Sequence, residues 1–456
     1  MIIIPEIHAQ DQDRTELFHE HAQARARGEV VALPTMLSRE QRRLYVRQTL
    51  REDHQFRIQN RPEGAQAKFE KLASAPFVFF RGTALLYYRD HAGSDAHLPQ
   101  VFTIGDVHPE NFGVMPNEDG APFFGVNDFD EAYVAPFSYD VKRGAIGFFL
   151  IARQNDPSKK KARKVARAFV NGYLEALRAY AHGDREKWHE FRIDNSPEMI
   201  RELLTSARTR REDFLDELID LEKERFISSD EIVPHSKYVA DFQDVVDRYR
   251  EENDIQETGK DEDFFKVVDV AIKKDSGTAS LGLDRYFVLI NGRSPAPADN
   301  IILEMKQARR SVLYGLVPDD DMEASRAPDI VTAQHIHLVG GDPYYGNVNM
   351  DDHSFLVRER SPYKDDVDVD DLDKKELKRY AHICGRTLAQ THARSDEDTG
   401  IMEGDAEKRI LSAIIPEVFI DDVVRFAQTA AKRIQKDYEL FQADLKLGAF
   451  EFLHGA

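Results

Sequence analysis

The chain has 456 residues, too many for one small core, and its 41% apolar residues can bury substantial cores. Its formal net charge of −20 repels phosphate backbones and anionic lipids, which argues against nucleic acid or a membrane as partner. The single cysteine, Cys384, excludes an intramolecular disulfide, and no stretch reaches the roughly 18 apolar residues of a membrane span. We therefore expect a cytoplasmic, globular protein of two or three domains.

Residues 1–100 are expected to form an N-terminal extension that begins with charged helices and ends in an aromatic segment. Ser38 followed by Gln41 is a capping pattern and predicts the start of a helix. Residues 75–82, APFVFFRG, supply aromatic side chains whose usual place is a core. Arg81 is different, because a guanidinium beside an apolar block usually has an anionic partner. A phosphate, an acidic site residue and a purely structural pairing all remain open.

Residues 101–143 contain the group of polar side chains whose types and spacing are most typical of a catalytic site. A β-type run at 101–104 leads into a polar turn, and apolar runs on either side of a turn at 117–120 predict a hairpin. The hairpin would bring the polar clusters before and after it to the same end. These clusters are Asp106, His108 and Asn111 on one side, and Asp128, Asp130 and Glu131 on the other.

Phosphoryl transfer needs the residue types found in these two clusters. A carboxylate accepts the proton of the attacking hydroxyl, which is the role predicted for Asp106. An amide oxygen and a second carboxylate hold Mg²⁺, which fits Asn111 and Asp128, with Asp130 competing for the metal role. The five-residue offset from Asp106 to Asn111 is that of kinase catalytic loops. The alternative is that these are ordinary turn and cap residues.

The motifs GDVHPEN at 105–111 and NDFDEA at 127–132 resemble the aminoglycoside-phosphotransferase branch of the protein-kinase-like superfamily, whose signature reads GDxHxxN, an apolar strand, then DF. With APFVFFRG and with SYDVKR at 138–143, the chain is more closely similar to a large bacterial family, within that superfamily, known only as a domain of unknown function. The resemblance implies that Asp140 braces the backbone of the catalytic loop. A simple charge at a helix N-terminus is the other interpretation, and both can hold.

Residues 160–253 carry apolar side chains at i, i+3 and i+4, which predicts charged amphipathic helices, one of them over 211–226. The polar residues 251–263 are typical of a linker.

Residues 265–362 are expected to form a β-rich nucleotide lobe. Runs at 267–272, 285–290 and 301–305 predict three strands, with Lys306 closing the third. In a kinase lobe the turn between the first two strands covers the phosphates of ATP, and the lysine neutralises them. The turn is not a Walker loop, because no Lys-Ser/Thr pair follows its last glycine. Its cofactor-binding candidates are Gly277, Ser280 and Gly282.

The two constellations occur in the reverse of the kinase order, since the catalytic loop precedes the nucleotide lobe. Residues 355–362 are typical of a last strand entering a hinge, and 371–394 resemble the helix before the catalytic loop. A circular permutation explains this order. We expect an α+β, protein-kinase-like two-lobe fold with extra helices, in which 101–250 and 370–456 form the helical lobe.

The function predicted on this basis is an ATP- and Mg²⁺-dependent phosphotransferase that acts on a small-molecule or protein hydroxyl. A non-catalytic nucleotide-binding pseudokinase is the main alternative, because Ala279 stands where related proteins have glycine and Thr332 stands where kinases have the glutamate that pairs with the lysine. A metal-dependent phosphoesterase is a weaker alternative, since Asp106 and His108 with Asp128 and Asp130 could bind two metals, but further His-rich ligand motifs do not follow.

Overall fold

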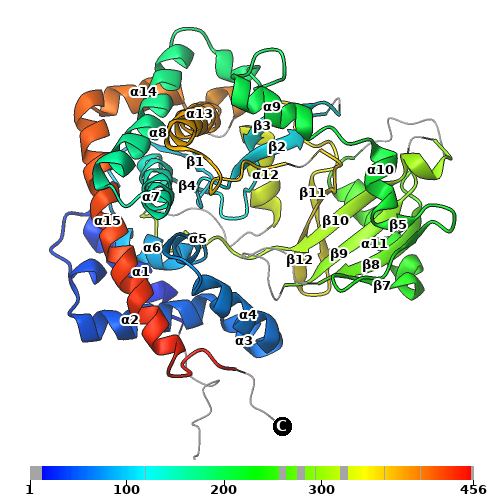
Figure 1. Cartoon of the computed structure of the whole chain (residues 1–456), viewed down its shortest axis with the longest axis horizontal. Helices are drawn as coiled ribbons and strands as arrows, with labels where there is room; N and C mark the ends of the chain where they lie inside the picture. Colours follow the sequence, from blue (N-terminus) through cyan, green and yellow to red (C-terminus); the bar gives the residue numbers. More distant parts are fainter. Residues whose placement is uncertain are drawn as a thin grey trace, which may run out of the picture.

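A computed structural model describes residues 13–118, 120–255, 263–274, 283–292, 294–318, 327–363, 365–400 and 402–452. It has a helical body with a large sheet beside it (Figure 1), and the buried apolar residues divide between these two parts. The core of the helical body draws on both ends of the chain, from Phe18 to Ala207 and from Ala308 to Phe452. Two smaller cores cover the two faces of the sheet. The mixed α+β class is thereby confirmed.

The N-terminal extension is helical, as predicted. Ser38 caps its second helix in a full capping box, accepting from the Gln41 backbone and donating its own N–H to the Gln41 side chain. The aromatic segment forms a short helix whose Phe77, Phe79 and Phe80 are buried. The helices are α1 (Thr15–Ala26), α2 (Arg39–Asp53), α3 (Gln55–Asn60), α4 (Pro62–Leu72), α5 (Pro76–Arg81) and α6 (Ala84–His91).

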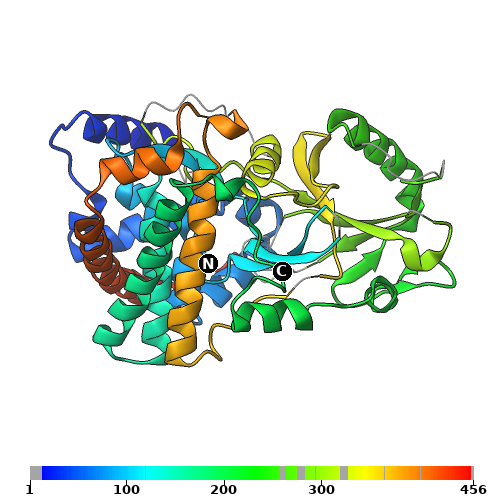
Figure 2. The same cartoon turned by 90° about the horizontal axis from the view of Figure 1, so that it is seen from above.

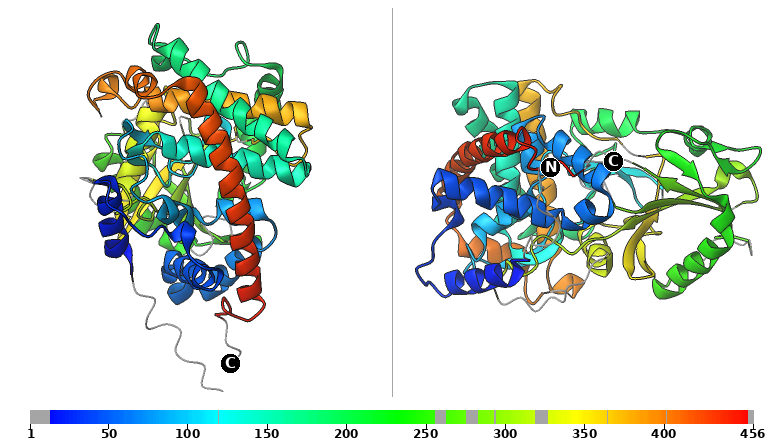
Figure 3. Two further views of the ribbon diagram at one scale, coloured as in Figure 1. Left: turned by 90° about the vertical axis from the view of Figure 1, so that its left-hand side faces the viewer. Right: turned by 90° about the horizontal axis from the view of Figure 1, so that it is seen from below.

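Within the helical body, the long helices α8 (Lys159–Tyr180) and α13 (Lys374–Ala393) pack closely against each other. A Cβ added at Gly172 would lie 2.1 Å from the His382 carbonyl oxygen, and one at Gly385 would lie 2.0 Å from the Phe169 carbonyl oxygen. Only glycine lets these backbones approach so closely. The longest helix, α15, runs past the N-terminal helices (Figure 3). The body contains α7 (Ser138–Asn155), α8 (Lys159–Tyr180), α9 (Glu198–Ser206), α13 (Lys374–Ala393), α14 (Ala406–Ala413) and α15 (Pro416–Leu445).

Two strand pairs carry the polar segment 101–143. Strand β1 (Gln100–Thr103) pairs antiparallel with β4 (Tyr133–Pro136). The predicted hairpin is confirmed as β2 (Phe112–Pro116) and β3 (Pro122–Val126), with Phe112 opposite Val126. In its turn, Gly120 has a φ of +74°, which favours glycine. The hairpin lies between the helical body and the large sheet (Figure 2).

The large sheet has six strands in the order β11-β12-β10-β9-β8-β7, and each pairing is antiparallel. The three predicted strands are confirmed as β8, β9 and β10. Along β9, Val288 and Ile290 face one core, while Phe287 and Leu289 face the other. The strands are β7 (Ile232–Pro234), β8 (Val267–Lys273), β9 (Arg285–Ile290), β10 (Ile301–Gln307), β11 (Gly346–Met350) and β12 (His353–Glu359).

Helix α11 (Val239–Glu252) packs on one face of this sheet, and helix α12 (Ala327–His337) lies between β10 and β11 in the sequence. Short 3-10 turns complete the structure: η1 (Pro34–Met36), η2 (Arg185–Lys187), η3 (Ser236–Tyr238), η4 (Pro297–Asp299) and η5 (Glu397–Thr399). Among the described residues, no helix is long and apolar enough to cross a membrane.

The prediction of one helix over 211–226 is wrong. Helix α10 (Arg211–Asp216) ends early, and the strands β5 (Ile219–Asp220) and β6 (Arg225–Phe226) follow as a hairpin. The reason is tertiary, because Ile219 and Phe226 are buried against the face of the large sheet rather than along a helix.

The large sheet also reaches beyond the predicted limits of the nucleotide lobe, since β7 and α11 come from the segment assigned to the helical lobe. Most of the predicted linker, and the turn with Gly277, Ser280 and Gly282, lie outside the described residues.

Candidate active site

The loop after β1 is shaped by a glycine. Gly105 has a φ of +84°, and a Cβ there would lie 1.9 Å from the Glu131 carbonyl oxygen. The carbonyl of Gly105 accepts the Tyr88 hydroxyl, which fixes the loop from the other side. The chain can therefore pass between β4 and α6 and present Asp106 at the loop's tip only with glycine at this position.

Asp140, on α7, holds the same loop by its backbone. Its carboxylate accepts the N–H of Ile104 at 2.7 Å and that of Gly105 at 3.0 Å. The Nε2 atom of His392 lies 3.1 Å from the same carboxylate, and Nδ1 of this histidine bonds the Tyr173 hydroxyl at 2.8 Å. Asp140 thus makes the backbone contacts that the resemblance implies, in a fully buried setting.

Asp106 is paired with a buried arginine. Nε of Arg143 lies 2.7 Å from the Asp106 carboxylate, and the guanidinium stacks 4.3 Å from the centre of the Phe80 ring. Burial raises the pKa of Asp106 above its ordinary value, although the Arg143 charge opposes this shift. The pairing orients the carboxylate and leaves one edge open, because the Asp106 side chain retains 20% of its exposure while Arg143 has none.

Asn111 stands opposite the end of β3 and has an unusual side chain. Its carbonyl accepts the N–H of Asn127 at 3.1 Å, which places Asn111 beside the residue that precedes Asp128. Asn111 is 1% exposed, yet neither its amide nitrogen nor its amide oxygen has a hydrogen-bond partner in the described parts of the chain. A buried amide without partners is costly, and an amide oxygen is a ligand that Mg²⁺ accepts. This observation fits the predicted metal role of Asn111.

Asp128 and Asp130 follow β3, and their pKa values are shifted in opposite directions. Burial and the neighbouring Asp130 charge raise the pKa of Asp128. Burial also acts to raise the pKa of Asp130, but the Lys306 ammonium, which forms an ion pair with it, lowers that pKa below its ordinary value. Within the described ranges Asp128 forms no ion pair, whereas Asp130 is paired with Lys306. Of the two, Asp128 is the better candidate for holding a metal.

Lys306, on β10, faces the site from the sheet. Glu304 shares its face of the strand but is held by Arg358 at 2.7 Å and by Arg285 at 3.4 Å. These arginines leave Asp130 as the acid that Lys306 binds. Thr332 of α12, the residue predicted to replace the kinase glutamate, is exposed, and its hydroxyl donates to the Pro328 carbonyl of its own helix at 2.9 Å.

These groups meet at two adjoining cavities. A small one of about 30 Å³ is lined by Asp106, Asp128, Asp130 and Lys306, together with Glu131, Leu283, Gln307 and Arg309. The neighbouring cleft has a volume of about 460 Å³ and shares Asp128, Asp130 and Lys306. That volume is in the range of small-molecule sites. The structure therefore brings together the predicted base, the predicted metal carboxylates and the predicted nucleotide lysine.

Residues 59–444 match the family described as an uncharacterized protein conserved in bacteria, DUF2252. The chain belongs to the DUF2252 family. The matched region runs from α3 to α15 and includes every element of the candidate site. No curated protein and no solved structure matches the chain. For this DUF2252 protein, the function therefore rests on the geometry of the site.

Arg81 lies at the rim of the larger cleft. It forms an ion pair with Glu110, which lies in the loop between β1 and β2, and both side chains are 32% exposed. Of the partners left open by the sequence, the acidic residue is the one observed. The ion pair links α5 to the loop between Asp106 and Asn111.

Three supporting contacts of this DUF2252 site were not predicted from the sequence. Arg143 and His392 bind Asp106 and Asp140, and Glu131 accepts the N–H of Val312 at 2.6 Å. Burial raises the pKa of Glu131 to about 7. A signal for Arg143 existed, because it follows Asp140 by three residues and so lies on the same face of a helix. His392 had no comparable signal, since 252 residues separate it from Asp140.

Proposed function

We propose that the protein is an ATP- and Mg²⁺-dependent phosphotransferase with a circularly permuted, protein-kinase-like two-lobe arrangement. One observation carries the proposal: Asp106, Asp128 and Lys306, from two separate parts of the chain, line one cavity between the helical body and the sheet. A base, a metal ligand and a phosphate-binding cation are the parts that phosphoryl transfer requires. The acceptor is a small-molecule or protein hydroxyl.

In this proposal Asp106 accepts the proton of the attacking hydroxyl. Arg143 keeps its carboxylate in place, and Asp140 fixes the loop backbone from below. Asn111 and Asp128 would hold Mg²⁺, which when bound supplies positive charge against the phosphates. Burial of Asp106 supports the role of a base, because a raised pKa brings a carboxylate closer to the pKa that general base catalysis favours.

The order of elements in the sheet supports a nucleotide lobe. Strands β8 and β9 are followed by the lysine strand β10, then by helix α12, as the lysine strand and its helix follow in kinases. Arg285, the first residue of β9, pairs with Lys306, so the β8–β9 connection leaves the sheet at the lysine's end. Leu283, before β9, lines the small cavity.

The permuted connectivity is supported by the packing of the helical body. Segments before and after the sheet form one core, and α13 packs against α8 along its length. The Arg42 guanidinium of α2 binds Asp437 of α15 at 2.7 Å across that core. Because the core does not depend on which end of the chain comes first, the catalytic-type loop can precede the sheet in the sequence.

A nucleotide-binding pseudokinase is the second candidate, and two observations favour it. Lys306 is bound to Asp130, an acid of the metal cluster, rather than to a residue of α12. Thr332 of α12 is exposed and has no carboxylate to offer. An active enzyme would have to release Lys306 from Asp130 when ATP binds.

Labelled ATP separates the two candidates. The purified protein is incubated with γ-labelled ATP and Mg²⁺, with and without a bacterial extract depleted of nucleotides. Transfer of label to an extract component, to water or to the protein itself, lost in Asp106→Asn, supports the phosphotransferase. Binding of ATP without any transfer supports the pseudokinase, and absence of ATP binding rejects both.

A further inference from the structure

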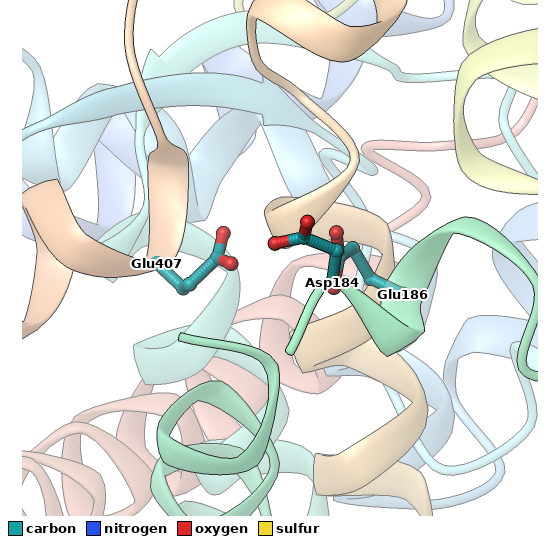
Figure 4. Close-up of side chains that lie close together, drawn as sticks. All are labelled: Asp184, Glu186 and Glu407. Atoms are coloured by element: carbon teal, nitrogen blue, oxygen red, sulfur yellow. The ribbon is translucent and has the colours of Figure 1, made fainter. Parts of the chain in front are cut away.

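Three carboxylates lie together beside α13, outside the linings of the two cavities of the candidate active site. Asp184 and Glu186 belong to the turn after α8, and Glu407 belongs to the first turn of α14. One carboxylate oxygen from each lies within 4.8 Å of the other two. Figure 4 shows Glu407 directed from one side toward the pair formed by Asp184 and Glu186.

Two of these carboxylates are buried and lack partners. Glu186 and Glu407 are each 2% exposed, and the Oε2 atom of each has no hydrogen-bond partner within the described ranges. Native structures rarely leave a buried carboxylate oxygen in this state, since its desolvation is not compensated. The two unpaired oxygens therefore point to a ligand of opposite charge.

The nearby cationic side chains do not reach the two unpaired oxygens. Lys187 binds Asp398 at 2.8 Å and the exposed Asp184 at 3.7 Å, and Lys408 forms an ion pair with Asp405. Arg394 donates to the carbonyl oxygens of Glu186 and Lys187, at 3.4 and 3.2 Å, and not to the carboxylates. Asp396 and Asp405 add further negative charge around Glu407.

We propose that Asp184, Glu186 and Glu407 form a divalent cation site that takes Ca²⁺. Ligand oxygens on one Ca²⁺ lie about 2.3–2.6 Å from the ion, so oxygens within 4.8 Å of one another can share it. The set is all carboxylate, with neither histidine nor cysteine, which disfavours zinc and suits a hard cation. Asp184 is 64% exposed, which leaves room for the water molecules that complete the coordination of Ca²⁺.

Bound Ca²⁺ would link the turn after α8 to the start of α14. The turn also contacts α13, because the carbonyls of Glu186 and His189 accept Nε2 of Gln390. The ion would stabilise the packing of three helices around a buried pair of charges. This role is independent of phosphoryl transfer and of the proposed Mg²⁺ ligands Asn111 and Asp128.

Calorimetry and thermal unfolding of the full chain test the site with Ca²⁺ itself. The protein is freed of metal with EGTA, exchanged into chelator-free buffer and titrated with CaCl₂. We expect Ca²⁺ to bind and to raise the melting temperature in the wild type and in Asp128→Asn. Both effects should weaken at least tenfold in affinity, or vanish, in Glu186→Gln and Glu407→Gln, and persist in Glu202→Gln, an exposed control on α9.

The outcomes that overturn the proposal are equally distinct. Absence of Ca²⁺ binding to the wild type overturns it, and this readout does not depend on any variant folding. Wild-type affinity in both Glu186→Gln and Glu407→Gln places the ion elsewhere. A Ca²⁺ response lost in Asp128→Asn assigns the ion to the candidate active site. Tighter binding of Mg²⁺ than of Ca²⁺ by Asp128→Asn, which lacks a proposed Mg²⁺ ligand, rejects the choice of ion. If the melting temperature falls with rising pH and does not change with Ca²⁺, the carboxylates share a proton and do not bind the ion.

Discussion

Asp106 and Asp128 line one cavity but have different surroundings, so their substitutions should differ. Asp106 is fixed by Arg143, and in the proposed mechanism it is the base, so Asp106→Asn should lower turnover by ~10²-fold or more with little change in Mg·ATP affinity. Asp128 is the proposed metal ligand, so Asp128→Asn should weaken both turnover and Mg·ATP affinity. Single-turnover transfer from labelled ATP and calorimetry with Mg·ATP measure the two effects.

The matched control for this pair is Asp194→Asn, an exposed aspartate remote from either cavity's lining. It should behave as the wild type in both measurements. Full phosphotransfer activity in Asp106→Asn would show that the kinase-type mechanism is incorrect, whatever the role of Asp128.

Lys306 should control nucleotide affinity, because the phosphates of ATP need a positive charge on a protein of net charge −20. Lys306→Ala should weaken ATP binding roughly tenfold or more, which corresponds to about 1.4 kcal/mol. Calorimetry is run for both proteins with Mg²⁺ and with EDTA. Lys266→Ala, which removes an exposed lysine, is the control. Equal ATP affinities of the wild type and Lys306→Ala, both with Mg²⁺ and with EDTA, would show that residues 265–362 are not a nucleotide-binding lobe.

Local spacing in the sequence was enough to select candidate residues but not their partners. Asp106, Asn111 and Asp128 lie within 23 residues and two strands, so their convergence follows from a single hairpin. The pair between Lys306 and Asp130 spans 176 residues and depends on how the sheet meets the helical body. Such contacts are set by tertiary packing, which no short-range pattern records.

At the scale of elements, prediction succeeded where local chemistry decides and failed where packing does. The capping box at Ser38 and the alternating strands β8 and β9 are local signals, and both elements are present. The segment 217–226 has helix-forming charged residues, yet it forms a hairpin because Ile219 and Phe226 are buried on the sheet. Burial of two large apolar side chains outweighs propensity differences of a few tenths of a kcal/mol per residue.

Arg42 joins three helices of the core and should be important for stability. Its guanidinium binds Asp90 of α6 at 2.6 Å and Asp437 of α15 at 2.7 Å, and all three residues are buried. Arg42→Leu would leave the buried Asp437 carboxylate without its arginine and Asp90 with only Arg433, at 3.3 Å, so it should lower the free energy of unfolding by about 3–5 kcal/mol. Urea unfolding followed by circular dichroism measures the loss.

Two comparisons identify the cause of that loss. The triple variant Arg42→Leu, Asp90→Asn, Asp437→Asn should regain part of the stability, because it leaves no buried charge. Arg167→Leu, which breaks an exposed pair with Asp421, should cost less than about 1 kcal/mol. An equally small loss in Arg42→Leu would contradict the proposed role of the buried pair.

Asp342, in the loop before β11, should make stability depend on pH. Burial and the neighbouring Glu359 raise the pKa of Asp342 to about 7 in the folded protein, above its ordinary value of 3.8. Between about pH 4 and 7 the folded state therefore binds a proton that the unfolded state releases, so stability falls as the pH rises through this window. Asp342→Asn should remove this fall, by at most about 1.4 kcal/mol per pH unit. Parallel urea-unfolding curves for the two proteins from pH 5 to 8 would contradict it.

At the scale of the whole molecule, the order of motifs in the sequence predicted which segments lie together, but it did not predict the limits of the sheet. Because the motif at 105–111 precedes the strands that end at Lys306, we expected both ends of the chain to share one helical lobe. The largest core draws on both ends of the chain. The limits of the sheet were missed, because β7 is a strand of three residues whose position depends on pairing with β8. A strand so short has too few residues to show periodicity.

The cavities are lined by residues of the helical body and of the sheet, so bound nucleotide should protect the backbone amides of both parts from hydrogen exchange. Asp106 and Asp128 come from the helical side, and Lys306 comes from the sheet. Mg·ATP at about 100 times its Kd should stabilise the wild type by about 2.7 kcal/mol and raise its melting temperature. Hydrogen exchange should then slow in β8, β9 and β10 and also in the loop between β1 and β2, while Lys306→Ala, whose affinity is about tenfold lower, should lose about half of the stabilisation or more. Protection confined to one side would mean that the nucleotide does not bridge the cavity, and the proposed transfer of phosphate toward Asp106 would then be wrong.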